Sequence, residues 1–482
     1  MKLVNYLKQN YLLCGIVLLA AFLRLFHLNF QSMVPDEMST MVHSDPNISI
    51  KDLMDKVNAN EGFPYLYFVL MRFFHMISYT PIVTRLFSAI MGILSVVYIY
   101  KLGKELLNRN TGLIAALLLT VNEFAIVTSQ DSRPYALIVL ATILSFYRLT
   151  ILIKNPTIKN AIWYGVFCGL VINTSFFATI TVFSQYLVLL FCLITAQKSE
   201  KLSLFKYYFI SGIVTLLLFI PNYKKLKTLV AIDTTWIPKP TENSLSEFLK
   251  GILGTSEICN IIFMVLFIFY IVKVFNIKPI KERANIIKDN ALLSFIICVS
   301  WIVVFIVIMY VKSIVGLSVM VHRYLISVLP AILIVFAMAL SFVRNKVVQG
   351  ITLFIIVVAL LINMVLFRAY YTNYSKTQYR ELAEVITTNV KPNETVYTSL
   401  AIWVNFFLSD ENKAKVYQKS SLDDVIREMM GNSSTIKTFW YVNADQGEYT
   451  IAPENQEFIN KTFRIDLEYT GYNVWAKHFV LR

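Results

Sequence analysis

Long apolar runs recur through the first three quarters of this chain and limit its fold more than any other feature. The first run, Tyr11–Leu28, is typical of them. A helix needs about 20 mostly apolar residues to cross the hydrocarbon core of a bilayer. Composition agrees, because 57% of the residues are hydrophobic and only 15% are charged, whereas soluble domains are about one quarter charged. The sequence therefore predicts a polytopic α-helical membrane protein.

Eleven runs are long enough to be membrane-spanning candidates. The first is too long for a signal-peptide core and lacks a small-residue cleavage site, so we expect a retained anchor. The stretch Phe63–Ile77 is short, aromatic and interrupted by Arg72, so we expect it to lie in the membrane interface. The eleven predicted spans are 11–28, 83–102, 111–129, 134–153, 161–178, 180–197, 205–221, 258–275, 291–311, 323–342 and 347–367.

The positive charges predict the orientation. The formal net charge is +14, but most Lys and Arg residues lie in short loops, which favours the positive-inside pattern over nucleic-acid binding. If Phe63–Ile77 does not cross, all these loops fall on one side, which predicts a cytoplasmic N-terminus and an outer C-terminus. The loops are those at 101–109, 148–159, 198–206, 278–288 and 344–346, joined by Lys2 and Lys8.

The tail after Arg368 is polar and mixed in charge. Helical patterns at 376–389 and 421–430 alternate with strand-like runs such as "TVYTS" and "TFWYVNA", which predicts a small α/β domain. We therefore expect a membrane domain at 1–368, with outer loops at 29–82 and 221–257, and an extracytoplasmic domain at 369–482. The five cysteines lie in or beside apolar runs without a CxxC pair, so no zinc site or disulfide framework is expected.

Two adjacent acids, Asp36 and Glu37 in "SMVPDEMST", follow the first apolar run. They could be solvated loop acids. Alternatively, a carboxylate tuned by burial could serve as a general base. A divalent metal at the pair is a further alternative, since adjacent acids can bind a hard cation.

Cations gather near the same predicted face. "SQDSRPYAL" holds Asp131, Arg133 and Tyr135 in one turn; it could be an interfacial belt, or its Arg could clamp an anion. "HRYLI" places His322, Arg323 and Tyr324 at the start of the tenth span, where snorkelling is a sufficient alternative. Arg24, His27 and Arg85 lie at ends of the first two spans, and this ring of cations around two acids suits a lipid phosphate.

Five motifs in order resemble the membrane-embedded GT-C glycosyltransferases, in the branch of protein O-mannosyltransferases and lipid A aminoarabinose transferases. They are "PDEMST", "RLFSAIMGILSVVYIYKLGKELLNRNTGLIAALLL", "SQDSRPYAL", "TTWIPKPT" and "HRYLISVLPAIL". The likeness covers nearly the whole chain. It implies inverting transfer of a sugar from a polyprenyl-phosphate donor to a glycan, lipid or protein acceptor outside the cytoplasmic membrane.

The resemblance also implies roles for matched residues. Asp36 would be the base and Glu37 its neighbour in the acceptor site. The donor phosphate would be held by Arg133, Arg323 and Arg85. The substrate would be lined by Asp131, Tyr135, His322, Tyr324 and Glu61.

One departure from the family pattern concerns "EGFPYLY", where Glu61 and Pro64 are present but the cation that many relatives carry before a proline pair is missing. Another residue must then assist the phosphate, or the donor differs. The main alternative function is a transporter or flippase of a lipid-linked glycan, which predicts charged or broken helices at mid-membrane. A third interpretation makes the tail a receptor or assembly module anchored by the membrane part.

Overall fold

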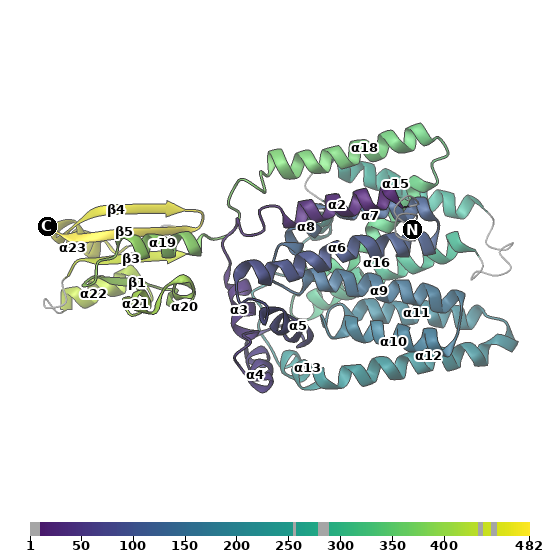
Figure 1. The fold of residues 1–482 in the computed structure, drawn as a ribbon, viewed down its shortest axis with the longest axis horizontal. Coiled ribbons are helices and arrows are strands. Elements are labelled where there is room, and N and C mark those ends of the chain that lie inside the picture. Colours follow the sequence, from purple (N-terminus) through teal and green to yellow (C-terminus); the bar gives the residue numbers. More distant parts are fainter. Residues whose placement is uncertain (1–9, 254–256, 278–288, 432–436, 445–450) are drawn as a thin grey trace. The chain divides into compact units, whose positions relative to one another are not determined.

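The computed structural model describes residues 10–253, 257–277, 289–431, 437–444 and 451–482. The loop at 278–288 and the residues Lys2 and Lys8, which entered the orientation argument, lie outside them. The chain divides into two compact units. A helical unit comprises Met1–Leu28 and His43–Arg368, and a mixed unit comprises Asn29–Val42 and Ala369–Arg482 (Figure 1).

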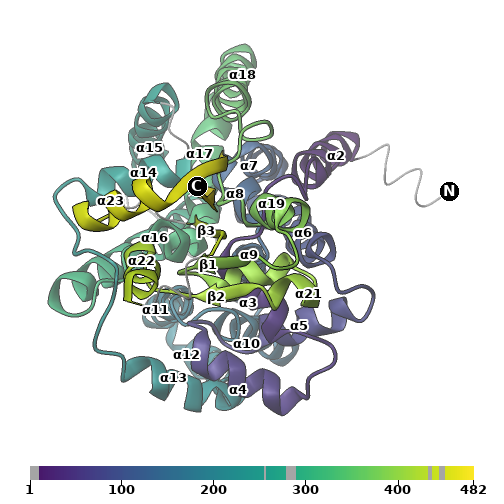
Figure 2. The ribbon, with the colours of Figure 1, turned by 90° about the vertical axis from the view of Figure 1, so that its left-hand side faces the viewer.

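The helical unit is built almost entirely from helices, which Figure 2 shows end-on. Shorter helices such as α4 and α13 run across that view, and α4, α5, α8 and α13 lie at one end of the unit in Figure 1. The helices are α2 (Tyr11–Leu25), α4 (Ile50–Asn60), α5 (Leu66–His75), α6 (Pro81–Leu106), α7 (Arg109–Val121), α8 (Glu123–Ser129), α9 (Tyr135–Lys154), α10 (Ile158–Ile172), α11 (Thr179–Thr195), α12 (Lys198–Phe219), α13 (Tyr223–Val230), α14 (Ser244–Leu253), α15 (Glu257–Ile277), α16 (Asn290–Val315), α17 (Leu329–Ser341) and α18 (Lys346–Ile362), with short helical turns η1 (Ile220–Asn222), η4 (His322–Val328) and η5 (Asn363–Phe367).

Each predicted span corresponds to one of these helices or to a pair of them. Within the described residues, seven helical segments are long and apolar enough to cross a membrane, and the bent pair α7–α8 would be an eighth. The helices α2, α10 and α11 are shorter, so the count of eleven remains a prediction. Helix α5 has 10 residues and rises only about 15 Å, half the hydrocarbon core, as an interfacial segment would.

The bend between α7 and α8 was not expected, because 111–129 reads as one apolar run. The two helices meet at 64°, and Asn122 between them accepts a hydrogen bond from the Ala125 N–H at 2.9 Å. The end of α7 leaves carbonyls without partners inside the helix. The buried Arg24 guanidinium donates hydrogen bonds to two of them, Leu119 O at 2.9 Å and Thr120 O at 3.2 Å. Arg24 therefore stabilises the bend between α7 and α8.

Helices α6 and α7 cross unusually closely through two glycines. A Cβ added to Gly112 would lie 2.4 Å from the Tyr100 carbonyl oxygen, and one added to Gly103 would lie 2.9 Å from the Gly112 Cα. No larger side chain fits this crossing without movement of the backbone. The crossing therefore fixes how the last turns of α6 lie against the start of α7.

The mixed unit contains a five-stranded sheet in the order β2-β1-β3-β5-β4. Strand β1 is parallel to β2 and β3, and β5 is antiparallel to β3 and β4. The strands predicted from the sequence coincide with the observed ones within one or two residues. The elements are β1 (Thr395–Thr398), β2 (Val416–Gln418), β3 (Phe439–Ala444), β4 (Phe463–Gly471), β5 (Val474–Leu481), α19 (Tyr379–Asn389), α20 (Ala401–Val404), η6 (Asn405–Phe407), α21 (Asp410–Lys413), α22 (Leu422–Gly431) and α23 (Pro453–Thr462).

The segment Asn29–Val42 belongs to the mixed unit by its contacts, whereas the sequence interpretation grouped the whole loop 29–82 with the membrane domain. It carries most of helix α3 (Pro35–His43). Three of its side chains, Met33, Met38 and Met41, join the hydrophobic core formed by α19 and the sheet. Two distant parts of the chain therefore build this unit.

Candidate functional site

The acidic pair opens helix α3, with Pro35 at its first position. Proline suits that position because its fixed φ matches the helix and no N–H is lost there. Acids are also favoured in the first turn by the helix dipole. Asp36 is exposed, whereas Glu37 is only 1% exposed. The Lys376 Nζ lies 2.8 Å from Glu37 Oε2, so the two neighbouring acids have different environments.

Side chains of the mixed unit hold the segment before α3 in place. The Gln31 amide donates to Asn373 O at 2.9 Å and accepts from the Ser375 N–H at 3.0 Å. The Arg380 guanidinium donates to the carbonyls of Asn29 and Phe30 at 2.9 and 3.0 Å. These hydrogen bonds fix the backbone that presents Asp36.

Three ionisable side chains of the helical unit, Glu61, Arg133 and His43, form a buried cluster. The sequence pointed to Glu61 and Arg133 but not to His43. The Arg133 guanidinium donates two hydrogen bonds to the Glu61 carboxylate, at 3.0 and 2.8 Å. The His43 Nδ1 lies 3.2 Å from Glu61 Oε1. All three residues are less than 8% exposed. The planar fork of Arg matches a carboxylate in this bidentate geometry.

The charges in this cluster keep Glu61 ionised. Burial is the largest single influence on the pKa of Glu61 and raises it. The hydrogen bonds and charges of His43 and Arg133 together outweigh burial and leave the pKa of Glu61 below its usual value. Arg133 also lies 5.2 Å from the Phe63 ring centre, and Phe63 packs edge-on against Tyr135.

Glu61 directly follows helix α4 and is its C-cap residue, so α4 positions it. The carbonyls at this helix end are capped from far along the chain: the buried Lys225 Nζ donates to Val57 O at 2.7 Å and Asn58 O at 3.0 Å. A cation at a helix C-terminus is favoured by the dipole. Lys225 therefore positions the end of α4, and with it Glu61.

A second buried histidine, His75, holds the segment between α3 and α6 in place. His75 ends α5 and is buried, with Nε2 at 2.9 Å from Thr84 Oγ1 and Nδ1 at 3.1 Å from Ser44 O. Burial lowers the pKa of His75 below its usual value of 6.5. The imidazole ties α5 to α6 and to the chain that follows α3.

The motif that begins at His322 forms the turn η4 rather than the start of a regular helix. His322 is exposed and Arg323 half-buried. The Arg323 guanidinium lies 5.4 Å from the Trp236 ring and 5.8 Å from the Tyr324 ring, and Tyr324 stacks on Phe177 at 4.9 Å. Trp236 comes from the predicted "TTWIPKPT" loop, so two of the sequence motifs meet here.

The structure thus sorts the predicted residues into groups with different surroundings. Glu61, Arg133 and Tyr135 are joined through Phe63. Arg85, only 1% exposed, donates to Leu28 O at 3.2 Å, and Asp131 is half-buried. His43 was missed, and nothing in the sequence indicated that Lys225 contacts the end of α4, because no local pattern marks a residue whose partner lies far away in the sequence.

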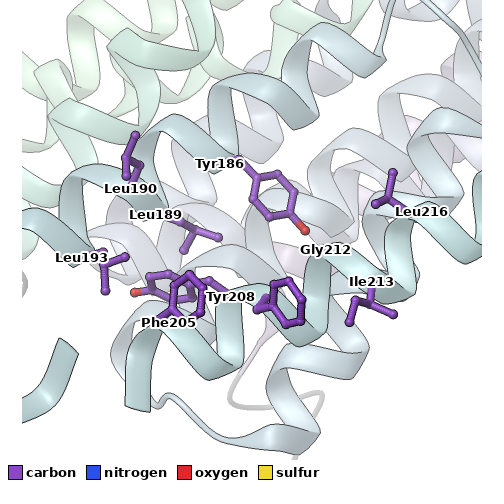
Figure 3. A pocket seen from close by; sticks show the side chains of 10 residues that line it. Tyr186, Leu189, Leu190, Leu193, Phe205, Tyr208, Gly212, Ile213 and Leu216 are labelled. Atoms are coloured by element: carbon purple, nitrogen blue, oxygen red, sulfur yellow. The ribbon is translucent and has the colours of Figure 1, made fainter. Parts of the chain in front are cut away.

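A recess of about 320 Å³ lies between α11 and α12, away from these residues. Its lining is apolar apart from the tyrosines, and Figure 3 shows the Tyr186 hydroxyl directed toward Gly212, whose added Cβ would lie 3.9 Å from that oxygen. Its lining contains no charged side chain.

The described residues contain no cluster of three or more His, Cys, Asp or Glu side chains that could hold a metal ion. The acidic pair at Asp36 and Glu37 therefore has no third ligand of these types in that part of the chain.

Comparison with known proteins identifies the fold. Residues 63–223, one third of the chain, match the family model described as dolichyl-phosphate-mannose-protein mannosyltransferase. No curated protein sequence gives a significant match. ArnT from Cupriavidus metallidurans, in the apo state and bound to undecaprenyl phosphate, aligns over 98% of both chains with a TM-score of 0.57 and 12% identity. The archaeal oligosaccharyltransferase AglB from Archaeoglobus fulgidus, in complex with an inhibitory peptide and a dolichol-phosphate, aligns over 91% of this chain and 70% of its own with a TM-score of 0.51 and 11% identity.

These matches confirm the resemblance to the GT-C glycosyltransferases and the predicted fold class. The chain is a multi-span helical membrane protein with a small C-terminal α/β unit. At these identities the solved structures establish the fold alone.

Proposed function

We propose that this chain is an inverting glycosyltransferase that moves a sugar from a polyprenyl-phosphate donor to an acceptor at the outer face of the cytoplasmic membrane. The observation that carries the proposal is the fold, shared along 98% of both chains with ArnT, a protein whose structure is known with undecaprenyl phosphate. In the same proposal the N-terminus is cytoplasmic and the mixed unit extracytoplasmic.

Asp36 is the general base in this proposal. It takes the proton from an acceptor hydroxyl, whose oxygen attacks the anomeric carbon of the sugar as the bond from that carbon to the phosphate oxygen breaks. The polyprenyl phosphate leaves with the electron pair, and the configuration at the anomeric carbon inverts. Of the two neighbouring acids, we choose Asp36 as the base because its side chain is exposed. Glu37 is buried and ion-paired with Lys376, and it serves to hold the helix start.

The leaving phosphate needs cations, since stabilising its developing charge contributes most to such a reaction. Of the three predicted arginines, Arg323 is the most accessible, and its guanidinium lies against the rings of Trp236 and Tyr324. Arg133 already holds Glu61, so it binds phosphate only by sharing its remaining N–H groups or by exchanging the carboxylate. We therefore assign the main phosphate contact to Arg323 and a supporting one to Arg133.

Sugar transfer by the full-length protein in proteoliposomes tests the proposal. Labelled polyprenyl-phosphate sugars serve as donors and a bacterial membrane extract as acceptor. We expect Asp36→Asn to lower turnover about 10²–10⁴-fold, the usual contribution of a general base, with donor binding unchanged. The matched control is Asp55→Asn, which alters an equally exposed acid on α4 and leaves transfer unchanged. Full activity of Asp36→Asn would disprove the assigned base, and the absence of transfer from every donor would favour the flippase alternative.

A further inference from the structure

A polar recess lies at the opposite end of α6 from its first turn, in a part of the helical unit that the proposed reaction does not use. Its volume is about 570 Å³, within the usual range of ligand pockets of about 300–1,000 Å³. It is lined by the last two turns of α6, the start of α7, the second half of α9 and the residue before α2. The lining residues are Asn10, Tyr100, Lys101, Lys104, Glu105, Arg109 and Tyr147.

Basic side chains outnumber acidic ones in the lining of this recess. Its charged lining residues are Lys101, Lys104, Arg109 and one acid, Glu105. That acid is already neutralised from beside the recess, because the Lys154 Nζ lies 3.3 Å from Glu105 Oε1. In the described part of the chain, no acidic side chain forms an ion pair with Lys101 or Lys104.

The close crossing of α6 and α7 gathers these cations. Because the backbones meet at Gly103 and Gly112, the short turn between the helices brings Arg109 beside Lys101 and Lys104. Like charges held together repel each other, so an arrangement of this kind gains from an anionic partner. The Lys101 ammonium lies 4.4 Å from the Tyr98 ring, a contact that steadies its stem without neutralising its charge.

The position of the recess indicates the source of that anion. Helices α6 and α9 are long and apolar enough to span a membrane, so their ends lie at the level of the lipid headgroups. Tyr100 and Tyr147 flank the cations, and tyrosines are enriched at that level. Basic pockets between the ends of spanning helices bind anionic lipid headgroups.

We propose that this recess binds the phosphate headgroup of an anionic phospholipid. The site lies at helix ends within a segment that the sequence predicts as a positively charged loop, and the lipid fastens the ends of α6, α7 and α9 together. It is separate from the proposed donor site, since none of its lining residues takes part in the cluster of Glu61, Arg133 and His43.

Native mass spectrometry of the full-length protein tests this proposal. The protein is purified in a neutral detergent, stripped of lipid and offered phosphatidylglycerol or phosphatidylcholine. We expect phosphatidylglycerol to be retained at least about tenfold better than phosphatidylcholine, and a Lys101→Gln/Lys104→Gln/Arg109→Gln variant to lose about 10–100-fold of that retention, because each cation near a lipid surface contributes to binding.

The matched control removes three exposed cations from predicted loops of the same sign, Lys159→Gln/Lys198→Gln/Lys206→Gln. It should keep the wild-type preference. A single Lys104→Gln variant, at an exposed position, provides a mild test if the triple variant does not purify as a monodisperse protein, and it should weaken retention severalfold. Equal retention by the recess variants and the control would overturn the proposal. Full displacement of the lipid by equimolar inorganic phosphate would overturn the lipid as the ligand.

Discussion

The buried pair of Arg133 and Glu61 makes a quantitative prediction about stability. Their guanidinium and carboxylate meet at 2.8 and 3.0 Å with both side chains less than one tenth exposed. Removing one partner of such a pair leaves an uncompensated buried charge, which costs about 3–5 kcal/mol. With an unfolding entropy of about 2.1 cal/mol/K per residue over the roughly 350 residues of the helical unit, Arg133→Met should lower Tm by about 4–7 °C.

A double-substitution cycle separates the pair from a simple packing effect. We expect Glu61→Gln/Arg133→Met to recover most of the stability lost by Arg133→Met, because the double variant removes the buried carboxylate together with its arginine. Thermal unfolding of each variant in the same detergent, followed by intrinsic fluorescence, gives the values. The control Arg344→Met removes an exposed arginine and should shift Tm by less than about 1 °C. The reasoning fails if Arg133→Met behaves like this control, or if the two substitutions in the pair lower Tm additively.

Three further predictions follow from contacts elsewhere in the two units. Because burial lowers the pKa of His75, the unfolded chain binds a proton at this residue more readily than the folded chain does. The contribution of neutral His75 to the free energy of unfolding is therefore fully present above pH 6.5 and declines below it. His75→Gln should flatten the fall in Tm between pH 7 and 5, and an unchanged slope would refute this. Gly112→Ala places a Cβ 2.4 Å from a carbonyl oxygen and should destabilise by about 1–3 kcal/mol, whereas Gly350→Ala, with open space around it, should raise helix stability slightly; similar Tm values for the two would contradict the crossing. Lys376→Met leaves Glu37 buried without its cation, so limited proteolysis should cut the segment before α3 faster than in the wild type, and equal rates would argue against the ion pair.

Apolar runs were enough to predict the long apolar helices but not α4, α13 or α14, because a continuous apolar stretch has few other ways to satisfy its backbone in a membrane. Alternating strand patterns likewise placed the strands of the mixed unit. The bend between α7 and α8 was missed, since its cause, the hydrogen bonds from Arg24 to Leu119 O and Thr120 O, lies 95 and 96 residues away. Local periodicity carries no information about such partners.

In the candidate site too, the sequence indicated individual residues but not their distant partners. Asp36 and Arg133 were singled out from their residue types and neighbours, and Glu61 from the family resemblance, but the sequence interpretation gave Arg133 and Glu61 separate roles. The structure pairs them across 72 residues, so much of the Arg133 charge is used within the protein. The different environments of Asp36 and Glu37 were equally hidden, because burial of Glu37 depends on Lys376, 339 residues further on.

The long sequence separation between Glu37 and Lys376 has a consequence for how the protein is synthesised. The acidic segment leaves the ribosome early, but Lys376 is synthesised 339 residues after Glu37, and the core residues that pack against Met33, Met38 and Met41 follow later still. At about 5–20 residues per second, the segment waits roughly 17–70 s for Lys376 and longer for the last strands. Until the last strands are complete, the segment that carries Asp36 lacks part of the core it packs into, so a nascent or C-terminally truncated chain lacks the proposed acceptor site even when every membrane helix is in place.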